Sequence, residues 1–155
     1  MKLFKTIIKA LVFPALFITA AQAQTNNAKA LIDGQNFVFR AQSVTPQTGN
    51  LRQLNNDYYT LRITKDAITS DLPYFGRAYT APIDPTQGGM QFTSKKFDYS
   101  VKEKKRKWEI TIKTKDVNDA AQMQLTVYDN GTAYLQVNST NRQPISYNGV
   151  IEEKK

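Results

Sequence analysis

Apolar side chains recur at every second position in long stretches of this chain from Phe37 to Val137, and this alternation constrains the fold more than any other feature. Successive side chains of a β-strand point to opposite faces, so each such segment has one apolar face and one polar face. Strands of this kind are typical of antiparallel sheets, because the strands of βαβ units are apolar on both faces. The sequence therefore predicts an all-β protein with an antiparallel sheet.

The alternating segments are separated by sequences that favour turns and loops. Asp129-Asn130-Gly131 predicts a hairpin turn, because Asn-Gly adopts the positive φ angles of a two-residue turn, and Asn148-Gly149 predicts a second one. The prolines and glycines of residues 72–89 predict an ordered loop. Residues 25–35 predict a short N-terminal helix that ends at Gly34.

About eight strands with one apolar face cannot remain a single open sheet, because both that face and the sheet edges would be exposed. Short turns between sequential strands favour an antiparallel up-and-down barrel, which is lipocalin-like. A two-sheet β-sandwich is the alternative, with residues 72–89 as the long connection that it needs. The interior of a small barrel is either filled by side chains or holds one small ligand, and the sequence leaves both open.

Residues 1–23 have the three parts of an export signal. A cationic start with three lysines is followed by an apolar stretch at residues 10–20 and by the small-x-small cleavage site Ala21-Gln22-Ala23. We therefore expect cleavage near Ala23 and a single β-barrel domain over residues 24–155, located in the periplasm or outside the cell. The apolar stretch is too short for a permanent membrane helix, so we expect no transmembrane segment in the mature chain.

The chain contains no histidine and no cysteine, which removes most of the usual catalytic and metal-binding chemistry. We expect no metal and no cofactor. The formal charge of +8 falls to about +5 when the three signal lysines leave, a mild excess that does not identify a partner. Five of the six residues Lys102–Lys107 are basic, but lysines at a hairpin tip are freely solvated and discourage edge pairing. No nucleic-acid-binding motif accompanies them, so we expect no nucleic-acid partner.

Carboxylate pairs, as in glycosidases, or a lysine or tyrosine base are the remaining basis for an enzyme. Asp66 with Asp71 and Asp116 with Asp119 are the close pairs in the sequence. Both flank predicted turns, where aspartate often caps the backbone with its own side chain. We therefore expect no enzyme, and we rank a hydrolase that uses carboxylates third among the functions.

The candidate ligand-binding residues are Tyr74, Phe75, Arg77 and Tyr79, close together in the loop at residues 72–89. Aromatic faces and a guanidinium can stack on a planar ligand and bind an anion. The structural alternative is that these aromatic side chains plug the barrel mouth. The leading functional interpretation is a non-enzymatic periplasmic binding module for a small apolar or aromatic-bearing ligand at the mouth.

Tyr58, Tyr128 and Tyr134 lie on the polar face of their strands by alternation, so we expect them on the outside of the barrel. An exposed set of tyrosines can serve as a contact surface for another protein. The alternative function is therefore a cell-envelope protein-interaction module with a filled core.

Two longer motifs resemble a known family. The first is Leu72 to Tyr79, which reads LPYFGRAY, and the second is Ser139 to Gly149, which fits SxNRQxISYxG. With these motifs the chain resembles small exported Bacteroidetes proteins of domain-of-unknown-function family 4251 over essentially its whole mature length. The family has no assigned activity. The resemblance therefore implies a β-rich exported domain, with a lipocalin-like barrel expected, and no catalytic residue.

Overall fold

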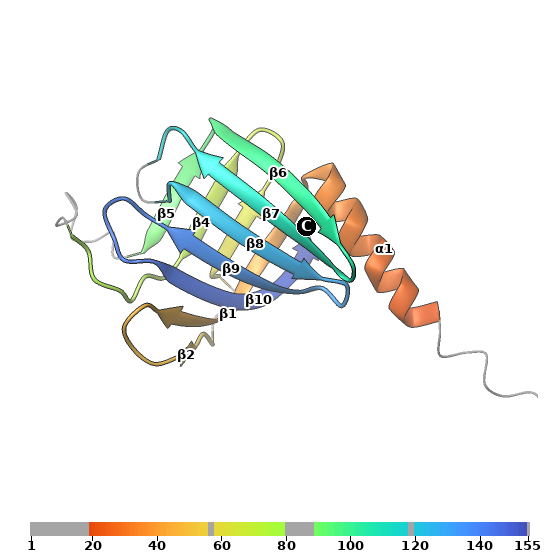
Figure 1. Ribbon diagram of the computed structural model, residues 1–155, viewed down its shortest axis with the longest axis horizontal. Helices are drawn as coiled ribbons and strands as arrows, with labels where there is room; N and C mark the ends of the chain where they lie inside the picture. Colours follow the sequence, from red (N-terminus) through yellow and green to blue (C-terminus); the bar gives the residue numbers. More distant parts are fainter. Residues whose placement is uncertain (1–18, 56–57, 80–88, 118–119, 155) are drawn as a thin grey trace, which may run out of the picture.

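The computed structural model describes residues 19–55, 58–79, 89–117 and 120–154 (Figure 1). Within these residues the chain forms one helix and ten strands. In chain order they are α1 (Thr19–Gly34), β1 (Phe37–Pro46), β2 (Arg52–Gln53), β3 (Thr60–Ile63), β4 (Ile68–Leu72), β5 (Met90–Ser94), β6 (Phe97–Lys104), β7 (Lys107–Thr114), β8 (Gln122–Tyr128), β9 (Thr132–Asn138) and β10 (Ile145–Glu153).

The strands form one antiparallel sheet whose order is β5-β4-β3-β1-β10-β9-β8-β7-β6, with β2 paired to β1 beside this path. The first long strand pairs with the last, in a register that runs from Phe37 opposite Glu153 to Pro46 opposite Ile145. This connectivity is that of an up-and-down barrel, with nine strands along the path where about eight are expected. The lipocalin-like barrel is therefore confirmed, and the two-sheet sandwich is not the fold.

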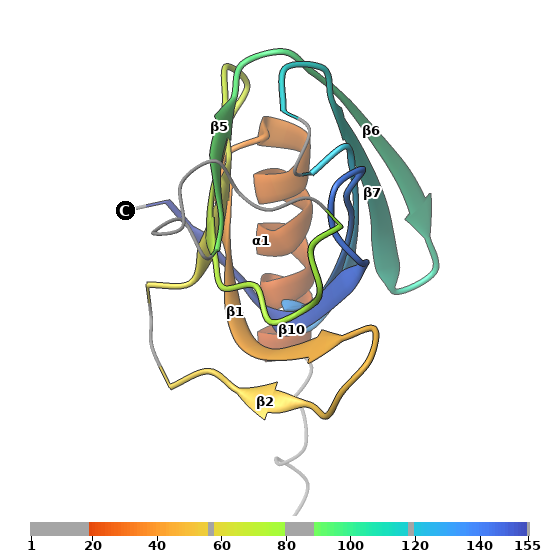
Figure 2. The same ribbon diagram turned by 90° about the vertical axis from the view of Figure 1, so that its left-hand side faces the viewer.

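The barrel is not fully closed, and α1 lies where it is open. Strands β5 and β6 stand at the two ends of the sheet order. Figure 2 shows α1 between the two end parts of the curved sheet, which we call its limbs. One limb contains β5 and the other contains β6 and β7. The Tyr99 hydroxyl on β6 donates to the Ile32 carbonyl at 3.2 Å, and Lys29 forms an ion pair with Glu103 at 2.8 Å. The helix is thus fastened to the limb that it faces.

The interior is filled by apolar side chains from both limbs and from the helix. Close packing of this kind is normal for a protein core, and each fully buried large side chain contributes about 1.5–3 kcal/mol to folding. The buried side chains include Ala28, Ile32, Phe37, Phe39, Leu61, Ile63, Ile68, Trp108, Ile110, Ile112, Met123, Leu125, Leu135 and Tyr147. Alternation therefore identifies most of the core correctly, and α1 adds Ala28 and Ile32 to it. The exception is β6, where alternation places Val101 on the core face although its side chain is exposed.

One predicted turn is confirmed and one is wrong. Asp129-Asn130-Gly131 joins β8 to β9 where a turn is predicted, but it is a three-residue connection in which Gly131 has a positive φ, of 82°, and Asn130 does not. Asn148-Gly149 is not a turn, because both residues lie inside β10 and pair with β1 and β9. Glycine is needed there for another reason: a Cβ on Gly149 would collide with the backbone carbonyl of Arg40 on β1. This close approach accompanies a register shift between Ala41 and Ser43, which is a β-bulge.

The N-terminal helix ends at Gly34 as expected, but it begins at Thr19, ahead of the predicted cleavage site. Most of the predicted signal lies in residues 1–18, outside the described residues. Cleavage after Ala23 would retain Ala28 and Ile32, the residues of α1 that are buried in the core. Among the described residues, no helix has the length and apolar character needed to cross a membrane.

Candidate functional site

The aromatic loop that follows β4 meets the loop between β9 and β10 at one end of the barrel, which we call the mouth. The Tyr79 N–H donates to the Asn141 carbonyl at 2.8 Å, and the Gln143 N–H donates to the Arg77 carbonyl at 3.0 Å. An isolated antiparallel bridge also joins the two loops, between Ala78 and Arg142. The fold therefore brings the two sequence motifs into direct contact.

Arg142 is the buried centre of this contact. Its side chain is only 7% exposed, its guanidinium carbon lies 5.0 Å from the centroid of the Tyr74 ring, and it donates to the Gly89 carbonyl at 3.0 Å. The Tyr74 hydroxyl lies 2.8 Å from the Arg77 carbonyl and 3.0 Å from the Gln143 carbonyl. Burial raises the pKa of Tyr74, so its phenol remains a neutral donor. Tyr74 therefore anchors the aromatic loop.

A second tyrosine holds the start of the loop from inside the barrel. Tyr147 on β10 is fully buried, and its hydroxyl donates to the Pro73 carbonyl at 2.8 Å. Burial in the apolar interior raises the pKa of Tyr147 well above its ordinary value. Hydrogen bonds to β10 or to the segment just before it thus hold the aromatic loop at Pro73 and at Tyr79.

A cleft of about 270 Å³ lies beside this loop and is open to solvent. Asp71 and Gln91 form a cross-strand pair on β4 and β5, and they add a carboxylate and an amide to the aromatic lining. The Phe75 ring is 40% exposed, and the guanidinium carbon of Arg52 on β2 lies 4.9 Å from its centroid. The lining residues are Tyr59, Asp71, Leu72, Pro73, Tyr74, Phe75, Gly89 and Gln91.

The four candidate residues have different surroundings. Tyr74 and Phe75 line the cleft, whereas Arg77 and Tyr79 are exposed and join the mouth through their backbone groups. The plug interpretation fits Tyr74, which is half-buried against Arg142. The other three side chains remain open to solvent, so the loop combines an anchor with an exposed aromatic surface.

Sequence reasoning missed Asp71 and Gln91 as lining residues and Arg142 as the anchor. Asp71 lies beside Gln91 only through the register of β4 and β5, which neither strand specifies alone. One signal for Arg142 was available, because it is the only charged residue from Ser139 to Tyr147. Arginine is rarely buried without specific partners, so an isolated one in such a segment indicates a contact.

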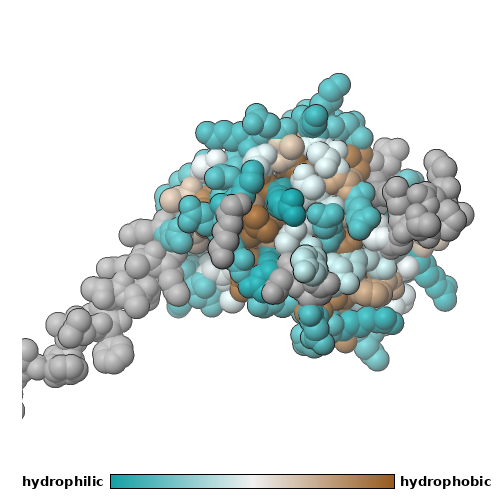
Figure 3. All heavy atoms as spheres, turned by 180° about the vertical axis from the view of Figure 1, so that it is seen from behind, coloured by the Kyte–Doolittle hydropathy of each residue, from teal (hydrophilic) through white to brown (hydrophobic). Residues whose placement is uncertain are grey.

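Exposed aromatic side chains also occur away from the cleft. Tyr58, Tyr128 and Tyr134 are exposed as expected, but only Tyr128 and Tyr134 lie on strands, and Tyr58 lies in a turn before β3. Figure 3 shows the face opposite to that of Figure 1, where apolar atoms reach the surface between hydrophilic side chains. The outer surface is therefore mixed in character on that side.

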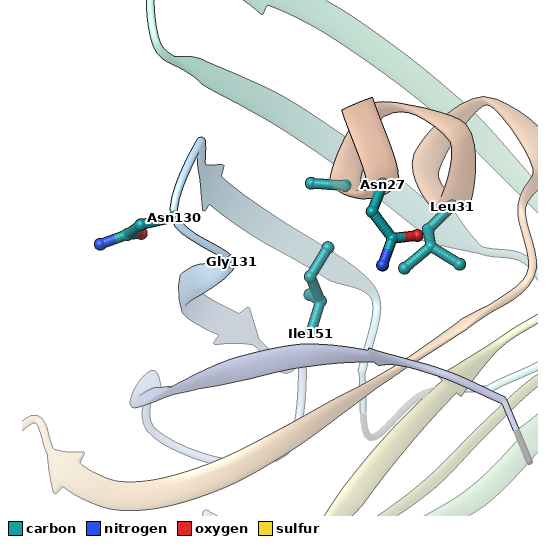
Figure 4. Close-up of a pocket in the computed structure, with 6 residues that line it drawn as sticks. Asn27, Leu31, Asn130, Gly131 and Ile151 are labelled. Carbon is teal, nitrogen blue, oxygen red and sulfur yellow. The ribbon is translucent and has the colours of Figure 1, made fainter. Parts of the chain in front are cut away.

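A second hollow, of about 190 Å³, lies between α1 and the turn from β8 to β9 (Figure 4). Ile151 extends from β10 toward Asn27 and Leu31 of the helix. The side-chain oxygen of Asn130 accepts hydrogen bonds from the N–H and the hydroxyl of Thr132, at 3.0 and 2.7 Å. The Asn130 oxygen is therefore already used within the turn. We interpret the hollow as the gap between the helix and the sheet and not as a ligand site.

The carboxylate of Asp116 caps the corner between β5 and β6. It accepts hydrogen bonds from the Ser94 hydroxyl at 2.5 Å and from the N–H groups of Lys95 and Lys96 at 2.8 and 3.1 Å, and these bonds lower its pKa. Its predicted pair partner, Asp119, lies outside the described residues. In the part of the chain that the structure describes, no group of three or more acidic side chains is placed to hold a metal ion.

The fold and the mouth define a small lipocalin-like barrel with a helix packed against its open side and a cleft at one end. The family model of DUF4251, a domain of unknown function, matches residues 19–151, and the chain belongs to this family. A crystal structure of a DUF4251 family protein from Bacteroides eggerthii has a similar fold, with a TM-score of 0.63 and 18% identity, over 84% of this chain and 88% of that chain. No curated protein matches the chain in sequence.

Proposed function

We propose that this protein is a non-enzymatic binding module that is exported to the cell envelope and holds a small apolar or aromatic-bearing ligand in the mouth cleft. The observation that carries the proposal is the cleft itself, where three aromatic rings meet a carboxylate and an amide. Small-molecule sites are concave and largely aromatic or apolar, with a few placed polar groups. Export is proposed from the signal pattern of residues 1–23.

The size of the cleft indicates the size of its ligand. Its volume of about 270 Å³ lies just below the usual lower limit of about 300 Å³ for small-molecule pockets. This volume suits a single ring with its substituents, or one ring of a larger molecule. The filled interior of the barrel supports a ligand site at the mouth rather than inside.

The polar groups of the cleft favour a ligand with hydrogen-bond donors. The Asp71 carboxylate is 3.9 Å from Arg62 in a largely exposed pair, which contributes little and leaves the carboxylate able to accept further bonds. The Gln91 amide both donates and accepts. We therefore infer a ring that carries hydroxyl or amine groups toward Asp71 and Gln91 and an apolar face toward Phe75.

The cleft is held in shape before any ligand arrives. Tyr74 is fixed by Arg142 and by carbonyl groups of both loops, and Pro73 is fixed by Tyr147. A rigid site loses less conformational entropy on binding. Turnover is not part of the proposal, because the chain has no histidine or cysteine and Asp116 is engaged in capping.

Native mass spectrometry of the protein purified from its own cell envelope tests this function. We expect the wild type to retain a small molecule, and we expect Phe75→Ala to reduce the retained fraction about tenfold because it removes one wall of the cleft. Tyr79→Ala is the matched control, since Tyr79 lies on the same loop outside the cleft. A wild type without ligand, or equal retention by Phe75→Ala, would contradict the proposal.

The filled core also favours a second function, as a protein-interaction module. Tyr58 is 80% exposed, and exposed aromatic side chains are common anchors of protein interfaces. A cross-linking pulldown from the cell envelope distinguishes the two functions. Capture of one envelope protein by a ligand-free wild type, with loss of capture in Tyr58→Ala, would favour this second function.

A further inference from the structure

Three adjacent strands form an outer surface that carries almost no charge. No charged residue occurs in β8, in β9 or in the part of β10 from Ile145 to Ile151. This is unusual for the chain, because 22% of its residues are charged. Other strands of the sheet carry charges on their outer faces, for example Arg62 on β3 and Asp71 on β4. The outer face of β8–β10 is thus chemically distinct.

The register of the strands arranges the outward side chains of this surface in rows. Figure 1 shows β7, β8, β9 and β10 side by side, with their outer face toward the viewer. Neighbouring strands lie about 4.8 Å apart, so the side chains of a row repeat at that interval. We call the following residues the polar grid: Thr111, Gln124, Gln136 and Ser146 in one row, and Thr126, Tyr134 and Asn148 in the next. The second row ends at Glu109 of β7, opposite Thr126, which is the charged edge of the grid.

Most members of the polar grid have unused hydrogen-bonding capacity. Within the described part of the chain, the side chains of Thr111, Gln124, Thr126, Gln136 and Tyr134 form no hydrogen bond with another protein group. A hollow of about 340 Å³ lies over one side of the grid. Its lining residues are Lys102, Glu109, Ile110, Thr111, Gln124, Leu125 and Thr126.

We propose that the polar grid binds a neutral polysaccharide chain. Amide and hydroxyl groups both donate and accept hydrogen bonds, which matches the hydroxyl groups of a sugar. The half-exposed ring of Tyr134 offers an apolar face to the C–H face of a sugar ring. A surface that repeats at each strand suits a ligand that repeats along its length. The strands β8 and β9 and residues 145–151 of β10 offer a charged polymer no counter-ion, and Glu109 at the edge of the grid is already paired with Lys104 and Lys107.

A protein partner matches this surface less well. The cores of protein interfaces are enriched in aromatic side chains, Met and Arg, and a few such anchors supply most of the binding energy. The polar grid has one aromatic ring, Tyr134, and its other members are amides and hydroxyls. Such groups bind well only when each hydrogen bond that they lose to water is replaced.

The binding is expected to depend on the length of the polysaccharide. A hydrogen bond on an exposed surface replaces one with water and contributes little net free energy, so one sugar unit is held weakly. Contacts of successive units add on one chain, because the later ones form at high effective concentration. The grid lies on β7–β10 and the mouth cleft on β3–β5, so the two sites can be tested separately.

Affinity gel electrophoresis of the purified protein tests the proposal. The gels contain a soluble β-glucan, an α-glucan, a galactomannan or an arabinoxylan, with polygalacturonate as the acidic comparison. We expect retardation by at least one neutral polysaccharide and none by polygalacturonate or by free monosaccharides. Tyr134→Ala and the double variant Gln124→Ala/Gln136→Ala are each expected to weaken retardation about tenfold.

Two controls separate loss of the site from other effects. Thr69→Ala/Thr93→Ala removes a cross-strand hydroxyl pair from the outer face of the opposite limb and should leave retardation unchanged. Phe75→Ala should also leave it unchanged, which distinguishes the grid from the mouth cleft. Gln124→Glu places a charge on an exposed position of the grid and should abolish binding even if the double variant is unstable.

Three results would overturn the proposal. The first is that no neutral polysaccharide on the panel retards the wild type. The second is that retardation is the same for the wild type and for folded grid variants, as judged by their melting temperatures. The third is that the grid variants abolish capture of an envelope protein by cross-linking while polysaccharide retardation is unaffected, which would assign the surface to a protein partner.

Discussion

The guanidinium carbon of Arg142 lies 5.0 Å from the centroid of the Tyr74 ring, and this buried stack joins two loops that are far apart in the sequence. Arg142 belongs to the segment that precedes β10, and Tyr74 belongs to the loop that presents Phe75 to solvent. The stack and the backbone bonds around it hold the cleft wall in place. The shape of the proposed site therefore depends on a contact that lies beneath it.

Arg142→Ala should destabilise the protein by about 2 kcal/mol or more, because it removes a buried cation–π contact and a hydrogen bond to the Gly89 carbonyl. Arg77→Ala is the matched control on the same pair of loops. Its side chain is exposed, so the free energy of unfolding should change by less than about 0.5 kcal/mol. Urea unfolding measures both, and equal effects of the two substitutions would contradict the anchor role.

Gly149→Ala should destabilise the barrel by about 1–3 kcal/mol, because the added methyl group meets the Arg40 carbonyl across the β1–β10 pair. Gly34→Ala provides the control, since a Cβ at Gly34 meets nothing within 4 Å. That substitution should be neutral or slightly stabilising. Thermal unfolding measures both variants. A Gly149→Ala variant as stable as the wild type would show that β1 and β10 are not in close contact there.

Tyr147→Phe should cost about 1–2 kcal/mol, because it leaves the part-buried Pro73 carbonyl without its donor. The substitution should also change the response to alkaline pH. Burial raises the pKa of Tyr147 in the folded state, so its contribution to stability is complete below the ordinary tyrosine value of 10.0 and is lost as the pH rises above it. Urea unfolding from pH 8 to 11 should therefore show a smaller decline for Tyr147→Phe than for the wild type. An unchanged decline would mean that this phenol is accessible to water.

Glu109 should make the stability of the hairpin between β6 and β7 sensitive to acid. Its ion pairs with Lys104 and Lys107, at 2.7 and 2.9 Å, lower its pKa from 4.5 to about 2. The lowered pKa contributes stability above pH 4.5 that is lost as the pH falls toward 2. Glu109→Gln should therefore flatten the decline in melting temperature over this range. High salt should reduce the difference from the wild type by screening these exposed charges, and a difference that persists in 1 M salt would point to another cause.

Alternation predicted the strands and the core because one-sided burial leaves a local record at every second residue, as at Phe37 and Phe39. It could not place α1, because two buried helix residues, Ala28 and Ile32, do not specify which gap in the sheet they fill. The prediction of a turn at Asn148-Gly149 is wrong for the same reason, because a local pattern does not show a contact with a distant strand. Its glycine meets a demand from β1, which is distant in the sequence.

The candidate site could likewise be predicted only in part. Tyr74 and Phe75 were found from their residue types, since aromatic side chains in a loop between strands are conspicuous in the sequence. Asp71 and Gln91 depend on the register of β4 and β5, and Arg142 depends on the meeting of two loops. Such long-range relationships are set by the packing of the whole barrel, which a single sequence does not display.

A crystal structure of the protein purified from its own cell envelope tests most directly whether the ligand binds outside a filled core. We expect a bound molecule beside Phe75 and Gln91 in the mouth cleft, with Ile32 of α1 still packed in the barrel interior. A ligand found between Phe39 and Leu135, with α1 displaced from the sheet, would contradict this account.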